Sequence, residues 1–257
     1  MAGLDQVSLK EADRIVSFIR RLVKSGSAKG VVVGLSGGID SAVVGALCVR
    51  ALGKEKVVGV LMPSDHTPAE DMRDARLLAG GWVIRTEEVP ISRIAEAVMS
   101  SSKIKGTKVA RANIEARVRM VVLYYFANTR GHVVAGTGDR SEALLGYYTK
   151  FGDGGVDFLP IVHLYKTQVR QLGASLGLPS VIVQKPSSPQ LWPGHKALDE
   201  IPADYDKLDI VLHHLFDLGS KPAVAASAAR APIKVVDEVL RMHMLTEHKR
   251  VLPPSLT

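Results

Sequence analysis

A glycine turn early in the chain carries residue types that bind phosphate. It reads SGGIDS, residues 36–41, and follows the β-branched run at residues 31–33. A turn between a buried strand and a helix presents unpaired backbone N–H groups and the positive end of the helix dipole. Glycines let the backbone approach an anion closely, and the hydroxyls of Ser36 and Ser41 add hydrogen-bond donors. This stretch therefore predicts a phosphate-binding loop.

Asp40 distinguishes this turn from commoner phosphate loops. No lysine follows the glycines, as a Walker A loop requires, and the spacing is not that of the Gly-x-Gly-x-x-Gly fingerprint. A carboxylate next to a bound phosphate would repel it unless a cation lies between them. Asp40 therefore implies a hard metal ion, with Mg²⁺ the best candidate. The alternative is a tight strand-to-helix connection in which Asp40 only stabilises the helix N-terminus.

The elements that must position this turn alternate between strands and helices. Residues 31–35 and 57–62 are short apolar runs, separated by a helix from about Ser41 to Leu52. Downstream we expect helices at 69–80, 91–100 and 109–128 and strands at 81–86 and 132–138. Such alternation without hairpin signals predicts an α/β fold, a doubly wound parallel sheet with helices on both faces. Ligands bind beyond the carboxyl ends of such strands, where the glycine turn falls.

The second half of the chain changes in character. Residues 149–160 are rich in glycine and residues 184–202 in proline, which predicts two long loops. Helical stretches follow, and no linker or repeat separates them from the rest. We therefore expect residues 1–257 to form a single domain with a helical C-terminal extension. The composition of 184–202 also suggests a lid that closes over a nucleotide.

The overall composition is that of a soluble globular protein. The chain has 257 residues, of which 46% are hydrophobic and 23% charged. Its net charge of +7 favours anionic partners but does not choose among them. The single cysteine, Cys48, excludes an intrachain disulfide and a cysteine metal cage, and it lies in an apolar run as a small buried hydrophobe would. No run approaches the ~20 apolar residues of a membrane span, so we expect a cytoplasmic protein with no membrane contact.

Several motifs together resemble a known family. SGGIDS is similar to the pyrophosphate loop of the ATP pyrophosphatases, or PP-loop enzymes, which have a Rossmann-like α/β fold of the adenine nucleotide hydrolase type. Nearly the whole chain then resembles the ammonia-dependent NAD synthetases in the order and spacing of its motifs. These motifs are NIEARVRM (113–120), GTGDRSEALLGYYTKFGDGGVDFLPI (136–161), LYKTQVRQLG (164–173), KPSSPQLWPG (185–194) and TEHKR (246–250). The resemblance implies a ligase that forms NAD from deamido-NAD, ammonia and ATP, releasing AMP and pyrophosphate.

The same resemblance assigns roles to individual residues. Catalysis would rest on Asp40, Lys166 and Asp157, and a metal ion would be held by Asp40 and Glu142. The residues implied to bind ATP are Gly34, Leu35, Ser36, Gly37, Gly38, Ile39, Asp40, Ser41, Thr137, Lys166 and Ser187. Those implied to bind deamido-NAD are Arg117, Lys150, Asp157, His248 and Lys249.

These roles fit simple chemistry. Negative charge builds on the departing pyrophosphate, where Lys166 and Mg²⁺ can stabilise it. Adenylation converts the substrate carboxylate into an electrophile that ammonia can attack, so no nucleophilic side chain is needed. The acidic GDGGVD loop, with Asp153, is a candidate for binding ammonium or accepting its proton. The sequence departs from the family after Gly194, where His195 and the next three residues replace a Gln-Thr-Asp-Glu-like segment.

The expected partners are ATP, deamido-NAD and ammonia, with Mg²⁺ as cofactor. The resemblance implies a homodimer, for which the apolar helices after Asp204 offer a surface, and ammonia that is free or comes from a separate protein. No nucleic-acid partner is expected, because aromatic residues make up only 5% and no RNA-binding module is evident. Two alternatives remain, a tRNA-modifying ATP pyrophosphatase and a nucleotide sensor that binds ATP without turnover.

Overall fold

A parallel four-stranded sheet forms the centre of the molecule. The structure is a computed structural model, and it describes residues 4–188, 190, 192 and 194–256. The strands are β1 (Val31–Gly34), β2 (Val57–Leu61), β3 (Arg85–Glu88) and β4 (Val133–Ala135). They lie in the order β3-β2-β1-β4, and Val31 of the central strand pairs with Val57 on one side and Val133 on the other. The predicted order of strands and helices is confirmed.

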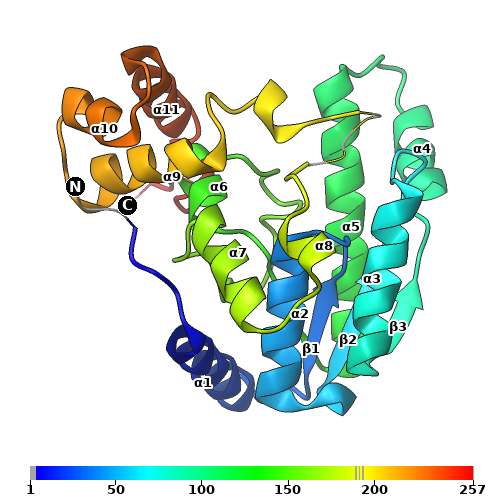
Figure 1. Cartoon of the computed structure of the whole chain (residues 1–257). Helices are drawn as coiled ribbons and strands as arrows, with labels where there is room; N and C mark the ends of the chain where they lie inside the picture. The colour runs from blue at the N-terminus through cyan, green and yellow to red at the C-terminus, as the bar shows by residue number, and fades with distance from the viewer. Residues whose placement is uncertain (1–3, 189, 191, 193, 257) are drawn as a thin grey trace.

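Helices cover both faces of this sheet (Figure 1). One face packs against α1 (Leu9–Ser25), α2 (Ile39–Leu52), α3 (Ala69–Trp82) and α7 (Lys166–Ser175). The other packs against α5 (Lys108–Arg130), with α4 (Ser92–Ser100) beside it. Val31 and Val33 point into the first core and Val32 into the second, and all three are fully buried. The fold is the doubly wound sheet that the sequence predicts.

One predicted strand begins later than expected. The structure continues α3 to Trp82, and Val83 then adopts a left-handed conformation with φ +54°. β3 therefore begins only at Arg85. The apolar residues at 82–84 made this stretch look like a strand, but Trp82 and Ile84 instead pack into the core beside α3.

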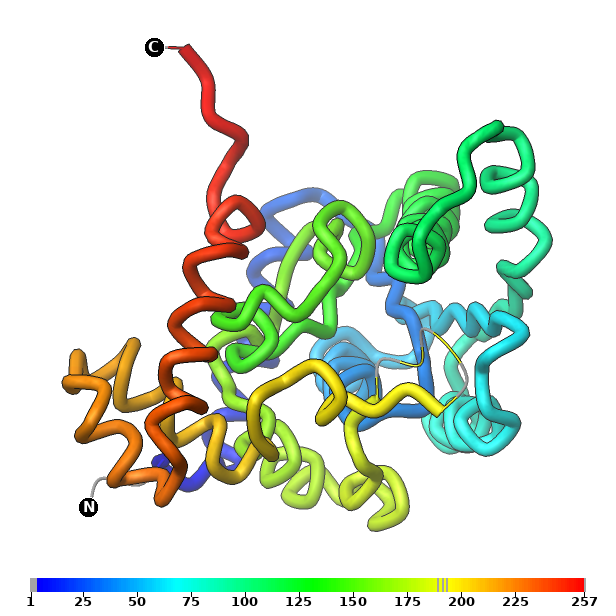
Figure 2. Tube along the Cα trace, turned by 90° about the horizontal axis from the view of Figure 1, so that it is seen from above, coloured from blue at the N-terminus to red at the C-terminus, as the bar shows by residue number. Residues whose placement is uncertain are grey.

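The C-terminal helices have a core of their own. They are α9 (Tyr205–Leu212), a π-helical turn (His213–Asp217), α10 (Pro222–Ala229) and α11 (Ile233–Leu245). Their apolar side chains pack with Leu145 of α6 (Arg140–Leu145) and with Tyr165, the residue before α7. The extension thus packs directly on the two helices that follow β4 and the glycine-rich loop. Figure 2 shows the residues after α11 leading away from the body, and Leu252 exposes 88% of its surface.

The remaining elements are short. They comprise α8 (Ser180–Val183) and the 3-10 turns Lys54–Lys56, Ala197–Asp199 and Glu247–Lys249. Within the described part of the chain, no helix is long and apolar enough to cross a membrane.

Candidate active site

The glycine turn connects β1 to α2 at the carboxyl edge of the sheet. Gly37 has φ +79°, and a Cβ at this position would lie 2.2 Å from the backbone oxygen of Asp71. The left-handed conformation and the close approach both require glycine. The hydroxyls of Ser36 and Ser41 lie 3.1 Å apart and tie the two ends of the turn together.

Some amides of this turn already have acceptors within the protein. Ser36 donates its N–H to Ser41 Oγ (3.2 Å), and Gly38 donates its N–H to Ser36 Oγ (3.3 Å). The amide of Gly37 and the first amides of α2 have no acceptor among the residues that the structure describes, and no side chain caps α2. These amides, at the positive end of a helix dipole, are the ones available to an anion.

A buried lysine lies between three carboxylates next to this turn. Lys166 Nζ is 2.7 Å from Asp40 Oδ2, 2.9 Å from Glu142 Oε1 and 3.0 Å from Asp139 Oδ2. The Lys166 side chain exposes only 1% of its surface. We call Asp40, Asp139, Glu142 and Lys166 the carboxylate–lysine cluster.

Three helix N-termini bring this cluster together. Asp40 is in the first turn of α2, and Lys166 begins α7. Asp139 caps α6, where its carboxylate accepts the Glu142 N–H at 2.8 Å while Glu142 Oε2 accepts the Asp139 N–H at 3.3 Å. This Asp-x-x-Glu capping box fixes both carboxylates relative to one another.

Burial and mutual repulsion shift the proton affinities of the cluster. Burial, with the neighbouring charge of Asp139, raises the pKa of Glu142 to about 8. Burial likewise raises the pKa of Asp139 to about 6, although Lys166 opposes the shift. Burial alone would lower the pKa of Lys166, but the three carboxylates hold it well above its usual range. Lys166 is therefore a permanent cation among acids that compete for protons.

The donor set of the cluster fits a hard cation. The carboxylates outnumber the lysine by three to one, and the buried Asp40 Oδ1 has no hydrogen-bond partner among the residues that the structure describes. Among the described residues, no three acidic, histidine or cysteine side chains form a metal cage by themselves. Mg²⁺ commonly takes only one or two carboxylates and completes its shell with phosphate oxygens and water. Asp40 and Glu142 match that requirement.

The predicted dinucleotide-binding residues form a second group. Arg117 of α5 donates to the Lys150 carbonyl (3.3 Å), and Lys150 donates to the His248 carbonyl. Lys249 donates to the carbonyls of Gly146 (2.6 Å) and Tyr148 (2.5 Å). Burial lowers the pKa of Lys249. The structure thus brings together α5, the 146–155 loop and the C-terminal turn, which lie far apart in the sequence.

Asp157 lies apart from the carboxylate–lysine cluster. Its carboxylate accepts hydrogen bonds from the Tyr124 hydroxyl (2.9 Å) and the Val134 N–H (2.7 Å). The segment beside it extends the sheet past β4, where Ala135 and Phe158 form a parallel bridge. No ion pair joins Asp157 to the cluster in the described ranges.

The two other predicted ATP contacts are not members of the carboxylate–lysine cluster. Thr137 stands between β4 and α6, two residues before Asp139. Ser187 accepts a hydrogen bond from Arg170 of α7 (3.2 Å) in the segment predicted as a lid. Residues 189, 191 and 193 of that segment lie outside the described residues.

Sequence reasoning missed four acidic residues near the site. Asp139 belongs to the cluster, and its position three residues before Glu142 is a capping-box signal that could have revealed it. Asp71 and Asp74, spaced three apart on α3, hold Lys185 beneath the glycine turn. Asp209 lies behind Lys166 and has no local signal.

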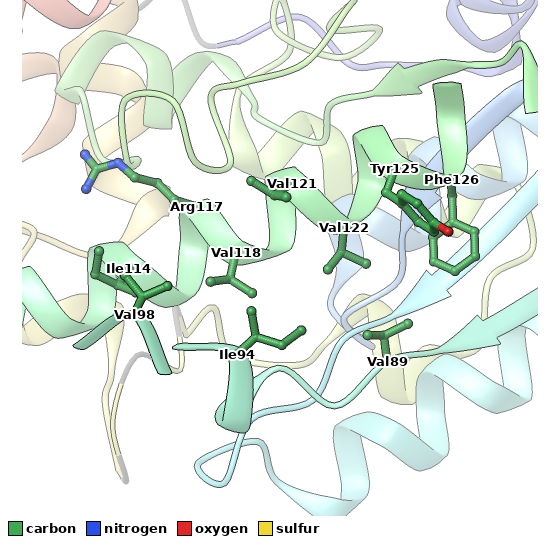
Figure 3. Close-up of a pocket in the computed structure, with 10 residues that line it drawn as sticks. All are labelled: Val89, Ile94, Val98, Ile114, Arg117, Val118, Val121, Val122, Tyr125 and Phe126. Atoms are coloured by element: carbon green, nitrogen blue, oxygen red, sulfur yellow. The ribbon is translucent and has the colours of Figure 1, made fainter. Parts of the chain in front are cut away.

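An open apolar groove runs between α4 and α5 (Figure 3). Its volume is about 530 Å³, and its apolar lining includes Ile94, Val98, Val118, Val121, Val122 and Tyr125. Arg117 stands at one end of the groove, so the groove adjoins the second group of basic residues.

A glycine turn that follows a strand of a parallel sheet and opens onto charged groups is the arrangement of nucleotide-binding α/β proteins. This chain is a member of that class. Within it, the chain belongs to the NAD synthase family, whose model matches residues 11–253. The tRNA-modifying and sensor alternatives are not supported by this match.

Relatives with known names agree with the family assignment. The NH(3)-dependent NAD(+) synthetase of Hyperthermus butylicus is 50% identical over 245 residues, which cover 95% of this chain and 89% of the relative. The structure of an NMN synthetase from Francisella tularensis has a TM-score of 0.88 at 32% identity, covering 98% of this chain and 99% of the other. An NH3-dependent NAD synthetase from Campylobacter jejuni has a TM-score of 0.84 at 30% identity, covering 99% and 100%.

Proposed function

We propose that this chain is an ammonia-dependent NAD synthetase. It joins deamido-NAD and ammonia with ATP as co-substrate, through an adenylated carboxylate, and releases AMP and pyrophosphate. The observation that supports this best is the carboxylate–lysine cluster, in which Lys166 lies 2.7 Å from Asp40, the acid of the glycine turn. A cation in this place, beside N–H groups without acceptors, suits a reaction whose leaving group is a polyphosphate.

The glycine turn would hold the ATP phosphates in this reaction. Residues 34–41 supply backbone N–H groups, and Lys166 stabilises the charge that develops as pyrophosphate leaves. Asp40 and Glu142 would hold Mg²⁺, which neutralises phosphate charge when bound. Thr137 and Ser187 flank the nucleotide. Ammonia then attacks the adenylated carboxylate, and no side-chain nucleophile is required.

The basic residues of the second group would bind deamido-NAD. Arg117, Lys150, His248 and Lys249 offer cations to the pyrophosphate and carboxylate of the substrate, and Asp157 offers an acceptor. Within the same 146–157 loop, Asp153 accepts the Thr149 N–H at 2.8 Å, and burial raises its pKa. A carboxyl with a raised pKa suits a group that takes a proton from ammonium.

The nitrogen would come from ammonia rather than from glutamine hydrolysed by this chain. Hydrolysis of glutamine by a nucleophilic cysteine requires a thiolate. Cys48 is fully buried in α2, and burial raises the pKa of its thiol to about 12. Ammonia is therefore free or is supplied by a separate protein. We also propose that the reaction takes place in the cytoplasm, where ATP is available.

We propose that the chain works as a homodimer through the groove between α4 and α5. The helices after Asp204, the surface that the sequence suggested, bury many apolar side chains in their own core but leave Val224, Ile233 and Met244 exposed. We favour the groove because its exposed apolar side chains, with Val121 at 60% and Tyr125 at 69%, line one continuous depression. Since Arg117 lies at the end of this groove, the dimer would place the dinucleotide site next to its interface. We further propose that residues 1–257 act as one domain.

The reaction can be tested with purified protein, ATP, Mg²⁺ and deamido-NAD, with and without ammonium. We expect NAD and AMP in equal amounts, only when ammonium is present, and a loss of activity on the order of 100-fold or more in Asp40→Asn. ADP in place of AMP would contradict the adenylation step. A parallel assay offers deamido-NMN, and a preference for this mononucleotide would contradict the assignment of the substrate.

A further inference from the structure

A buried carboxylate of the C-terminal extension contacts the backbone that carries Lys166. Asp209 of α9 is fully buried. Its Oδ2 accepts hydrogen bonds from the N–H and the hydroxyl of Thr167, both at 2.8 Å. Its Oδ1 accepts the hydroxyl of Ser141 at 2.6 Å, and Ser141 Oγ accepts the N–H of Lys166 at 3.0 Å. One carboxylate therefore accounts for the hydrogen bonds of the first two amides of α7. It accepts the N–H of Thr167 directly and is linked to the N–H of Lys166 through the hydroxyl of Ser141.

Asp209 acts as the missing cap of α7. The first amides of a helix have no partner within it, and a side chain just before the helix commonly accepts them. Tyr165 stands at that position and caps no amide, because its hydroxyl donates to Asp217 (2.7 Å). The carboxylate of Asp209 supplies the acceptor from another helix, at the end of α7 where a negative charge is favoured.

The same carboxylate also fixes the position of α6. Ser141 lies between Asp139 and Glu142, the two acids that this helix contributes to the carboxylate–lysine cluster. Asp209 thus joins the backbone of both acids to the backbone of the lysine that lies between them. α9 adds a second contact, because Lys166 Nζ lies 5.4 Å from the ring centre of Tyr205.

We propose that Asp209 is a positioning residue for Lys166. By holding the N-termini of α6 and α7 in one arrangement, it places Lys166 Nζ between Asp40, Asp139 and Glu142. Its effect on the reaction rests on the proposed function. A displacement of a catalytic group by ~1 Å can reduce the rate on the order of 100-fold, so a residue that sets this position controls kcat without touching the substrate.

A double-mutant cycle tests the proposal. We expect Asp209→Asn to lower kcat on the order of tenfold or more while the KM for ATP changes less than about threefold, because the glycine turn is untouched. In the Lys166→Met background, Asp209→Asn should lower kcat by less than about twofold, since it acts through the side chain already removed. The proposal would be overturned if the fold-losses of kcat of the two single variants multiplied in the double variant. An unchanged kcat in Asp209→Asn would overturn it as well.

The matched control is Asp204→Asn in the same helix. Asp204 caps α9 by accepting the Lys207 N–H at 3.1 Å, and in the described part of the chain no hydrogen bond or ion pair joins it to α7. We expect this variant to change stability by less than about 1 kcal/mol, because asparagine caps a helix about as well as aspartate, and to keep its kcat. If Asp209→Asn does not fold, Ser141→Ala takes its place in the cycle. This variant removes the acceptor of the Lys166 N–H. We expect it to lower kcat as Asp209→Asn does, and to have little further effect in the Lys166→Met background.

A measurement that does not depend on enzymatic activity tests this proposal independently of the proposed function. The reaction of Lys166 with acetic anhydride, followed by mass spectrometry, reports how well its buried amine is held. The acetylation rate of Lys166 is compared with that of the exposed Lys207 in the same protein. We expect this ratio to be higher in Asp209→Asn than in wild type and unchanged in Asp204→Asn. Equal labelling would overturn the positioning role. Absence of NAD formation by wild type would instead overturn the proposed function and leave the labelling result to decide the role of Asp209.

Discussion

At the scale of single residues, Gly37 shows most directly why the glycine turn has its sequence. Two effects oppose any side chain there, a φ of +79° and a distance of 2.2 Å from a hypothetical Cβ to Asp71 O. At Gly53 only the first of these two effects operates. It has a similar φ of +81°, but a Cβ there would meet no atom of the described residues within 4 Å.

We predict that Gly37→Ala is more harmful than Gly53→Ala. Gly53→Ala should cost about 1–3 kcal/mol of unfolding free energy through its backbone conformation alone, and it should leave the KM for ATP unchanged. Gly37→Ala should cost more and raise the KM for ATP, because the turn must move away from Asp71. Urea unfolding and steady-state kinetics measure both effects, and equal costs at the two positions would contradict this reading of the turn.

The raised pKa of Glu142 predicts that a proton is released when the nucleotide binds. With a pKa of about 8 the carboxyl is mostly protonated at pH 7, and a metal ion requires its ionised form. Binding of Mg²⁺ and ATP should therefore release protons at pH 7, and affinity should rise as pH increases towards 8. Calorimetry in two buffers of different ionisation enthalpy measures the release. Glu142→Gln should abolish this contribution, and a wild-type protein that releases no protons would contradict a metal role for Glu142.

At the scale of elements, Lys185 joins three segments that the chain separates. Lys185 follows α8, and its Nζ lies 2.7 Å from Asp71 Oδ1 and contacts Asp74, two buried acids of α3. It also donates to the Gly37 carbonyl at 3.3 Å. The carbonyl of Gly37 and the N–H of Gly38 belong to one trans peptide unit and point in opposite directions. By binding this carbonyl, Lys185 also helps to fix the direction of the Gly38 N–H, which donates to Ser36 Oγ.

We predict that Lys185→Met destabilises the protein by about 3 kcal/mol, because it leaves the buried Asp71 without a cation and leaves Asp74 only the more distant Arg73, at 3.7 Å. Lys207→Met provides the control, since Lys207 is exposed, and its effect should stay within about 0.5 kcal/mol. The midpoint and slope of urea unfolding measure the difference. A cost equal to that of the control would mean that Asp71 and Asp74 do not depend on the lysine.

At the scale of the whole molecule, the apolar groove and the basic group lie on adjoining surfaces. α5 contributes to both, with Val121 in the groove and Arg117 at its end (Figure 3). The proposed dimer would therefore cover the groove and adjoin the dinucleotide site.

Val121→Glu tests the dimer. Placing a charge in an apolar interface costs several kcal/mol, so the variant should be monomeric in analytical ultracentrifugation and should lose affinity for deamido-NAD. Leu77→Glu on α3 is the matched control, because Leu77 exposes 57% of its surface against 60% for Val121 and lies outside the groove. This control should remain dimeric and active. A wild-type monomer, or a Val121→Glu variant that is still dimeric, would contradict the proposed interface.

Interactions between neighbouring residues specify the local parts of this protein. The β-branched run at 31–33, the glycine turn and the helix after it follow from neighbouring residues, because strand burial, turn conformation and helix initiation are local effects; the helix, expected from about Ser41, begins at Ile39. The role of Asp40 in an anion- and metal-binding turn is predicted for the same reason. The family resemblance added Lys166 and Glu142, which local reasoning alone would have left as solvated or helix-capping charges.

Which charged side chains contact one another depends on long-range packing. Lys166 contacts Asp40 across 126 positions of sequence, and Asp209 reaches Thr167 across 42. A single sequence does not predict such a pair, because the residues around an acid on a helix do not show whether it faces solvent or a buried lysine. Packing of α6, α7 and α9 around one core excludes water from these groups, and the loss of water makes each charge depend on its partners.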